Sequence, residues 1–243
     1  MIRLIIFMLY AIIVVIATPF IFLFMRLFWK NNQTKMDTFT QKFVRGVFKC
    51  VLFISGVKTT ALGLENIPDD TAVLYVGNHN SYFDILTSYI YFKKPTGYVA
   101  KKEMLRYPLL RQWMKYVHCL FLDRDNPKEA LKTILTGIEE VKAGYSLFIF
   151  PEGTRSENGE MIPFKEGSLK IAEKSKCPVI PVTFNNTAAI FENHMPFLKK
   201  AHIVIEFGKP IIISELDAEN KKFLGAYTQN IIAGTYEKNK VLV

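Results

Sequence analysis

The pattern of apolar and polar positions divides the chain into an apolar start, an amphipathic second segment and a longer alternating part. Residues 4–25 carry no charged side chain. At roughly 1.5 Å per residue, a helix of this length reaches across a hydrocarbon core about 30 Å thick. Pro19 lies within the run and predicts a kink or a helix end there. The run is long for the apolar part of a signal peptide and no small-residue cleavage pattern follows it, so we expect a lasting membrane contact.

The second segment, after a polar hinge at residues 31–40, has a helical period. One side carries Phe39, Phe43, Val47, Cys50 or Val51, and Ile54, and a different side carries Lys42, Arg45 and Lys49. A basic amphipathic helix of this kind either lies at a membrane surface or packs on a protein core, and both interpretations remain open. We therefore divide the chain into N-terminal membrane-anchoring helices, residues 1–58, and one globular domain, residues 59–243.

Charge next to the apolar run predicts its orientation. Seven basic residues and one acid, Asp37, lie between Arg26 and Lys58, whereas Arg3 is the only charged side chain before the run. By the positive-inside rule, the globular domain is on the cytoplasmic face of the membrane. The same pattern fits either a transmembrane span or an anchor in one leaflet.

From residue 59 onward, short apolar runs alternate with amphipathic ones. This alternation is typical of an α/β fold with a mostly parallel, twisted sheet flanked by helices. We expect strands at residues 73–76, 98–100, 118–122, 147–150, 179–184 and 203–207, and helices at residues 85–92, 104–116, 127–143, 165–175 and 215–238.

Composition narrows the classes of function. A length of 243 residues, half of them hydrophobic, fits one domain plus an anchor. The net charge of +9 favours anionic partners such as an acidic membrane surface. Nucleic acid is disfavoured because the sequence contains no recognition motif. The three cysteines are widely spaced and without a Cys-x-x-Cys pair, which indicates neither a disulfide framework nor a zinc site.

The first cluster of candidate chemistry follows the strand at residues 73–76. His79 and Asp84 are five residues apart and could not meet within a regular helix, where they would be about 140° apart. They can meet if His79 precedes the helix and Asp84 lies in its first turn. A carboxylate on one imidazole nitrogen makes the other nitrogen a general base. Alternatively, Ser81 and Asp84 form a capping box with no catalytic role. We interpret Ser81 as a helix cap rather than as a nucleophile.

A second cluster, Pro151-Glu152-Gly153-Thr154-Arg155-Ser156, follows the strand at residues 147–150. Ligands in an open α/β sheet bind at the carboxyl ends of the strands. Both clusters are therefore expected at the same crevice.

Four ordered blocks carry a family resemblance. They are Asn78 to Asp84, Phe121 to Arg124, Phe150 to Ser156, and Val179 to Val182. Over roughly residues 62–207 the chain resembles the glycerolipid acyltransferases, and most closely their 1-acyl-sn-glycerol-3-phosphate acyltransferase (lysophosphatidic acid acyltransferase) branch. The resemblance implies an enzyme of phospholipid biosynthesis that acylates the sn-2 hydroxyl of lysophosphatidic acid and forms phosphatidic acid. The acyl donor would be a thioester, either acyl-coenzyme A or acyl carrier protein, with no covalent enzyme intermediate.

The resemblance also implies residue roles. Arg124, Glu152, Gly153 and Arg155 would bind the acceptor phosphate, with Thr154 as a supporting contact. An arginine fork suits phosphate oxygens, and a glycine lets the backbone come close. A carboxylate repels phosphate, so we assign Glu152 to holding Arg155 or the glycerol hydroxyl.

Two basic positions carry alternatives. Arg124 could instead form a surface ion pair with Asp123 or Asp125. Lys101, at the end of the strand at residues 98–100, could polarise the thioester carbonyl, although Lys101 and Lys102 also fit a solvated pair.

Other classes of function remain as alternatives. A metal-dependent hydrolase could use His79, Asp84, His118 and Glu152, but there is no His-Glu-x-x-His pair, so we expect neither a metal nor a cofactor. A non-catalytic lipid-binding protein would not need the two strand-end clusters. Another lysophospholipid or an aminolipid remains open as acceptor. We interpret His118, His194 and His202 as structural, since none has a carboxylate at suggestive spacing.

Overall fold

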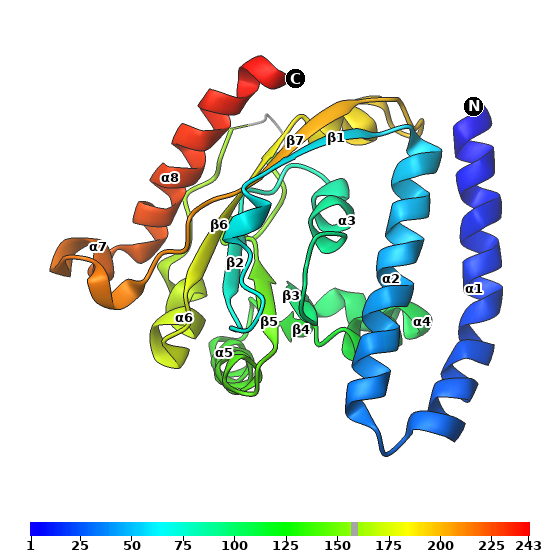
Figure 1. Cartoon of the computed structure of the whole chain (residues 1–243), viewed down its shortest axis with the longest axis horizontal. Helices are drawn as coiled ribbons and strands as arrows, with labels where there is room; N and C mark the ends of the chain where they lie inside the picture. Colours follow the sequence, from blue (N-terminus) through cyan, green and yellow to red (C-terminus); the bar gives the residue numbers. More distant parts are fainter. Residues whose placement is uncertain (157–159) are drawn as a thin grey trace.

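A seven-stranded sheet forms the centre of the computed structural model, which describes residues 1–156 and 160–243 (Figure 1). Its strand order is β1-β7-β6-β2-β5-β3-β4. The strands are β1 Lys58–Leu62, β2 Leu74–Gly77, β3 Thr96–Lys101, β4 Leu120–Leu122, β5 Ser146–Ile149, β6 Val179–Asn185 and β7 His202–Phe207. From β6 to β4 all neighbours are parallel; β7 is antiparallel to β6, and β1 is parallel to β7. The predicted mostly parallel α/β sheet is confirmed.

Both faces of the sheet are covered because the central strands are apolar on both sides. On one face, Leu74 and Val76 share a core with residues of α5 (Pro127–Lys142), α6 (Lys170–Ser175) and α8 (Leu224–Asn239). On the other face, Tyr75 and Phe148 pack with residues of α3 (Phe83–Tyr89). The centre of the sheet is thus rigid, which leaves its strand ends to carry function.

The first two helices form an antiparallel hairpin on one side of the sheet (Figure 1). Helix α1, Ile2–Trp29, is continuous through Pro19, so the predicted helix end at Pro19 is wrong. It is long and apolar enough to cross a membrane, and only 6% of its most apolar window is buried. Its exposed apolar surface indicates membrane association.

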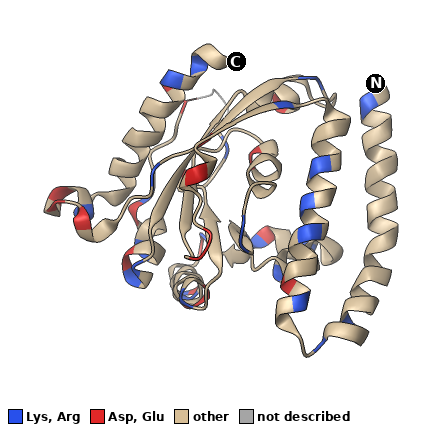
Figure 2. Ribbon diagram, in the orientation of Figure 1, with Lys and Arg blue, Asp and Glu red and all other residues tan. Residues whose placement is uncertain are grey.

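Helix α2, Gln33–Ser55, lies between α1 and the sheet domain (Figure 1). Val44 and Phe48 pack against the core, and the Arg45 guanidinium donates to the carbonyl oxygen of Phe92. Lysines and arginines recur along α2 (Figure 2), but Arg45 turns toward the domain, so the predicted grouping of Lys42, Arg45 and Lys49 on a separate basic side is wrong. Of the two interpretations of this segment, packing on the core is correct, but it uses Val44 and Phe48, which the predicted apolar side did not include.

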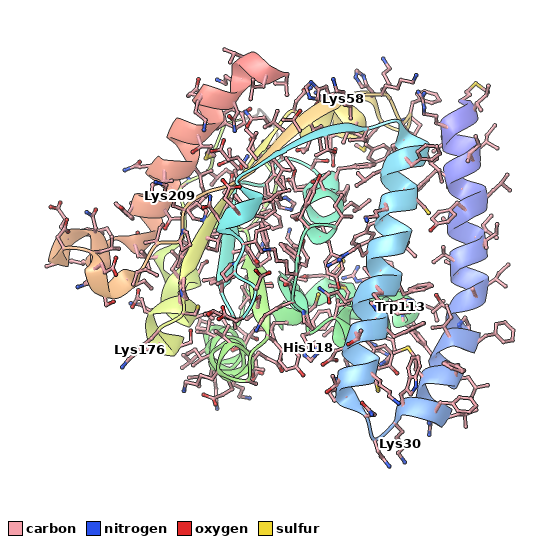
Figure 3. The ribbon with its side chains drawn as sticks, viewed as in Figure 1. Lys30, Lys58, Trp113, His118, Lys176 and Lys209 are labelled. Carbon is pink, nitrogen blue, oxygen red and sulfur yellow. The ribbon has the colours of Figure 1, made fainter. Side chains whose placement is uncertain are left out.

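Aromatic side chains join the hairpin to helix α4, Pro108–Tyr116. Trp113 packs against Phe22 of α1 and Phe43 of α2, with ring centroids 4.9 and 4.8 Å apart. Its indole N–H donates to the hydroxyl of Thr18 at 3.0 Å, inside the otherwise apolar α1. Trp113 accordingly lies on the hairpin side of the molecule (Figure 3).

Helix boundaries differ from the sequence prediction where proline or an irregular residue interrupts the pattern. The predicted helix at 104–116 is a 3₁₀ turn, Lys102–Arg106, followed by α4, because Pro108 disfavours helical backbone at Tyr107 and suits a first helical position. The predicted helix at 165–175 likewise begins as a 3₁₀ turn, Glu166–Leu169, before α6. The predicted helix at 215–238 is divided at Phe223 into α7, Ala218–Lys222, and α8.

The two outer strands of the sheet, β1 and β4, differ from the sequence prediction. Strand β1 was not predicted, since its five residues show only a weak alternation. Strand β4 begins at Leu120 rather than at His118, because His118 has a left-handed backbone (φ 60°) that ends the turn after α4.

Candidate active site

The candidate residues gather at the carboxyl ends of the five parallel strands. His79 follows β2, Lys101 ends β3, Arg124 follows β4 and Glu152 follows β5. Because parallel strands end at the same edge, residues far apart in the sequence become neighbours. The expectation that both clusters lie together at the carboxyl ends of the strands is therefore confirmed.

His79 and Asp84 form a hydrogen-bonded pair. The Nδ1 atom of His79 lies 2.9 Å from Oδ2 of Asp84, whose side chain is fully buried. His79 precedes α3 and Asp84 lies in its first turn, as the spacing predicts. The opposite ring nitrogen, Nε2, makes no hydrogen bond with residues 1–156 or 160–243. This arrangement leaves one imidazole nitrogen to exchange a proton with a substrate.

Asp84 also caps the helix start, so the two interpretations of this acid are compatible. Its Oδ2 atom accepts the backbone N–H groups of Asn80 and Ser81, both at 2.8 Å. The fully buried hydroxyl of Ser81 accepts the backbone N–H of Phe83 at 2.9 Å. Ser81 therefore acts as a cap, and its burial does not suit a covalent nucleophile.

Glu152 supports the histidine loop and does not hold Arg155. Its Oε1 atom accepts the backbone N–H of His79 at 2.6 Å, and Oε2 accepts that of Ile162 at 2.8 Å. Burial raises the pKa of the Glu152 carboxyl, and these two N–H bonds oppose the shift. The predicted Glu152–Arg155 contact is wrong because the carboxylate is used by buried backbone donors, which are costly to leave unpaired.

Two further contacts fasten the two sequence clusters together. The rings of His79 and Phe150 are stacked, with centroids 3.9 Å apart and planes inclined by 15°. The backbone N–H of Ser156 donates to the carbonyl oxygen of His79 at 2.8 Å. These two contacts and the bond from His79 to Glu152 hold the His79 imidazole against the loop that carries Arg155.

Arg155 contacts residues of the histidine loop and a glutamate that the sequence analysis did not single out. Its guanidinium carbon lies 3.8 Å from the centre of the Tyr82 ring, and Nη2 donates to the Tyr82 hydroxyl at 3.1 Å. Its Nη1 donates to Glu192 at 3.2 Å. The guanidinium has five N–H groups, so donors remain for an anion.

Arg124 and Lys165 both lie beside Gly153. The guanidinium of Arg124 donates to the carbonyl oxygen of Gly153. A Cβ atom on Gly153, which has a left-handed backbone (φ 81°), would lie 3.1 Å from the Lys165 ammonium nitrogen. The alternative ion pair of Arg124 with Asp123 or Asp125 does not form within the described residues, and Asp123 pairs instead with Lys102 at 2.6 Å. The sequence analysis did not single out Lys165, because a lysine in a loop before a helix matches no functional motif.

Lys101 and Thr154 have less definite surroundings. Both side chains are exposed, and neither has a side-chain hydrogen bond within the described ranges. Lys101 pairs in register with Leu122 at the end of β3, which places it at the same sheet edge as His79. Its suggested role with a carbonyl therefore stays a prediction.

His118 lies at the opposite edge of the sheet, just before β4 (Figure 3). Its ring contacts Asp37 of α2 and Glu140 of α5, both at 3.1 Å, and these contacts agree with the structural role expected for His118 although neither acid stands at a telling sequence spacing. Burial lowers the pKa of His118, but the bonds and charges of Asp37 and Glu140 outweigh burial and raise it overall. Opposing burial in the same way, His118 and Tyr145 lower the pKa of Asp37. This histidine links α2 to the domain.

No group of three or more His, Cys, Asp or Glu side chains within residues 1–156 and 160–243 is arranged to hold a metal ion. The alternative metal-ligand set of His79, Asp84, His118 and Glu152 is wrong. His79 follows the carboxyl end of β2, whereas His118 precedes the amino end of β4, so the two histidines lie at opposite ends of the strands.

Comparisons with known proteins agree with this arrangement. A family model described as Acyltransferase matches residues 58–185. The chain is 30% identical over 198 residues to the 1-acyl-sn-glycerol-3-phosphate acyltransferase of Borreliella burgdorferi, covering 82% of this chain and 79% of that protein. It is 32% identical over 172 residues to the protein of that name from Cocos nucifera, covering 70% of this chain and 55% of that protein. The chain thus spans about half the length of the latter.

The fold is also known from a crystal structure. That of the 1-acyl-sn-glycerophosphate (LPA) acyltransferase PlsC from Thermotoga maritima matches with a TM-score of 0.80 at 23% identity, over 98% of both chains. Sequence and fold together define the class: the chain belongs to the acyltransferase family. The relatives from Borreliella burgdorferi and Cocos nucifera both carry the name 1-acyl-sn-glycerol-3-phosphate acyltransferase.

Proposed function

We propose that the protein transfers a fatty acyl group from an acyl thioester to the sn-2 hydroxyl of 1-acyl-sn-glycerol-3-phosphate and forms phosphatidic acid. The observation that carries the proposal is the His79–Asp84 pair, fastened through Glu152 and Phe150 to the loop of Arg155. A base and a cation held on two joined loops suit an acceptor that has both a hydroxyl and a phosphate.

In the proposed reaction, Nε2 of His79 removes the proton of the sn-2 hydroxyl as its oxygen attacks the thioester carbonyl. The tetrahedral intermediate then collapses, the carbon–sulfur bond breaks, and the thiolate takes the proton from His79. Asp84 stabilises the imidazolium and fixes its tautomer through Nδ1. The acceptor supplies the nucleophile, so no covalent enzyme intermediate forms.

Cations beside the histidine loop would hold the acceptor. Arg155 is stacked on Tyr82, and Arg124 and Lys165 lie beside Gly153. These side chains offer planar forks and an ammonium to the phosphate oxygens. The donor would be acyl-coenzyme A or acyl carrier protein, and Lys101 is the candidate to polarise its carbonyl.

The anchor fits a substrate that resides in a bilayer. We propose that the exposed apolar surface of α1 lies in the membrane, with the domain on the cytoplasmic side. The basic side chains of α2 and of both ends of α1 would favour an anionic membrane surface (Figure 2).

A transfer assay with the purified protein in detergent tests the proposal. Lysophosphatidic acid and rival lysolipids would be offered with each thioester donor, and phosphatidic acid formation measured. We expect His79→Ala to abolish transfer while the protein stays folded. His202→Ala is the matched control, because His202 of β7 lies two strands from β2 in the sheet and its ring bonds Thr60 of β1. Retained activity in His79→Ala would remove this histidine from the mechanism.

A further inference from the structure

Glu192 is an acidic side chain at the candidate active site that lies outside the region matched by the family model. It begins a short 3₁₀ turn, Glu192–His194, after β6 and a preceding turn, Thr187–Ile190. The family match ends at residue 185. Only 14% of the Glu192 side chain is exposed.

Both carboxylate oxygens of Glu192 are used, and every partner belongs to one of the two active-site clusters. Oε2 accepts the hydroxyl of Ser81 at 2.7 Å. Oε1 accepts the backbone N–H of Tyr82 at 2.8 Å and Nη1 of Arg155 at 3.2 Å. One side chain therefore joins the loop of His79 to the loop of Arg155 from a third strand end.

Arg155 is held in one orientation by this contact. The guanidinium carbon lies over the Tyr82 ring, Nη2 donates to the Tyr82 hydroxyl, and Nη1 donates to Glu192. A third of the Arg155 side chain is exposed, so a free arginine here would sample many rotamers. Ordering such a side chain only when substrate arrives weakens binding.

We propose that Glu192 is a positioning residue that pre-orders Arg155 for the acceptor phosphate and fixes the Ser81–Tyr82 corner beside His79. This inference rests on the proposed function, because it names what Arg155 is held for. Glu192 acts through Arg155 and does not itself touch the acceptor, since a carboxylate would repel phosphate.

The alternative role for this carboxylate is competition, in which phosphate displaces Glu192 from Arg155. The contacts favour positioning. Glu192 keeps two neutral partners, the Ser81 hydroxyl and the Tyr82 N–H, that phosphate binding does not replace. Ser81 is fully buried, and leaving its hydroxyl without an acceptor is unfavourable, so the carboxylate should stay when the acceptor lipid binds. The two roles predict opposite effects on acceptor affinity.

Two substitutions separate the charge of Glu192 from its hydrogen bonds. Glu192→Gln can still accept the Tyr82 N–H and bond the Ser81 hydroxyl, but it loses the charge that faces Arg155. We expect the acceptor KM to rise roughly 3- to 10-fold, the cost of ordering one long side chain on binding, with kcat and the donor KM unchanged. Glu192→Ala also frees the corner beside His79, so kcat should fall as well.

Glu237→Gln is the matched control, because it removes one acidic charge from an exposed pair with Lys240 on α8. Its acceptor KM should equal that of the wild type. A lower acceptor KM in Glu192→Gln would overturn positioning in favour of competition. Equal KM values in both variants would overturn it as well.

A binding measurement gives a readout that does not depend on turnover. The affinities of lysophosphatidic acid and of the monoacylglycerol with the same chain would be compared by titration calorimetry in neutral detergent micelles. We expect Glu192→Gln to reduce the wild-type preference for the phosphorylated lipid roughly 3- to 10-fold. A preference retained in Glu192→Gln contradicts only the role of Glu192. A wild type that binds both lipids equally contradicts the proposed acceptor itself.

Discussion

Replacement of Asp84 by asparagine separates the proposed catalytic role of this residue from its capping role. The Oδ2 atom of Asp84 accepts three donors: Nδ1 of His79 at 2.9 Å and the backbone N–H groups of Asn80 and Ser81 at 2.8 Å. An asparagine oxygen at this position can still accept both backbone N–H groups. It carries no charge, however, and so does not stabilise the imidazolium. If the amide is reversed, its N–H₂ group faces Nδ1 and favours the wrong tautomer.

The two roles differ in expected magnitude. A positioned general base typically contributes about 10²- to 10⁴-fold to a rate, which corresponds to roughly 3–5 kcal/mol of activation free energy. A damaged helix cap costs about 0.5–2 kcal/mol of folding free energy. For a chain of this size, that corresponds to a Tm lower by about 2–4 °C per kcal/mol. We therefore expect Asp84→Asn to lose at least about 10²-fold in kcat with a small change in Tm.

The assay measures kcat for phosphatidic acid formation at saturating acceptor, together with Tm by circular dichroism in the same detergent. Asn220→Asp is the control, because Asn220 lies on the exposed helix α7, where its side chain bonds Asp217. This exchange of an amide and a carboxylate away from the site should leave kcat unchanged. A kcat reduced less than about tenfold, with a clearly lower Tm, would refute the reasoning and leave Asp84 as a helix cap alone.

Three further predictions follow from the same contacts. Arg155→Lys keeps the charge but loses the planar fork, so the acceptor KM should rise about tenfold or more, the equivalent of one hydrogen bond between charged groups. A rise in the donor KM instead would assign Arg155 to the donor site. Because the pKa of His118 is raised in the fold, the protonated histidine stabilises the protein below pH 6.5, and this stability is lost as pH rises through the folded-state pKa. Between about pH 6 and pH 9, the Tm of the wild type should therefore fall more than that of His118→Gln. Gly153→Ala and Gly144→Ala should both lower stability by about 1–2 kcal/mol because both glycines have left-handed backbones, but only Gly153→Ala, whose Cβ meets Lys165, should raise the acceptor KM.

The parts of the fold and site that could be predicted are those with a local signal. The strands that precede His79 and Glu152 are short apolar runs, and the carboxyl ends of parallel strands must meet at one edge. The contact of His79 with Asp84 follows from a five-residue spacing across a helix start. These residues could be placed without coordinates because each depends on a turn that the sequence itself encodes.

The parts that could not be predicted depend on tertiary contacts alone. Glu192 meets Ser81 across 111 positions in the sequence, and Asp37 meets His118 across 81. Neither acid stands at a spacing that marks a partner. Of the two partners predicted for Glu152, Arg155 is wrong for a related reason, because the backbone N–H groups that Glu152 binds carry no side-chain signature, and the glycerol hydroxyl stays a prediction. Long-range polar pairs of this kind become visible only when the sheet order is known.

The aromatic junction of Trp113 with Phe22 and Phe43 has a consequence for how the enzyme is seated. Because α1, α2 and α4 share these rings, we expect the apolar helix and the sheet to move together. If α1 lies in the membrane as proposed, a change in its tilt would change the height of the His79 imidazole relative to the lipid headgroups. We therefore expect turnover in vesicles to vary with bilayer thickness, and Trp113→Ala to weaken that dependence.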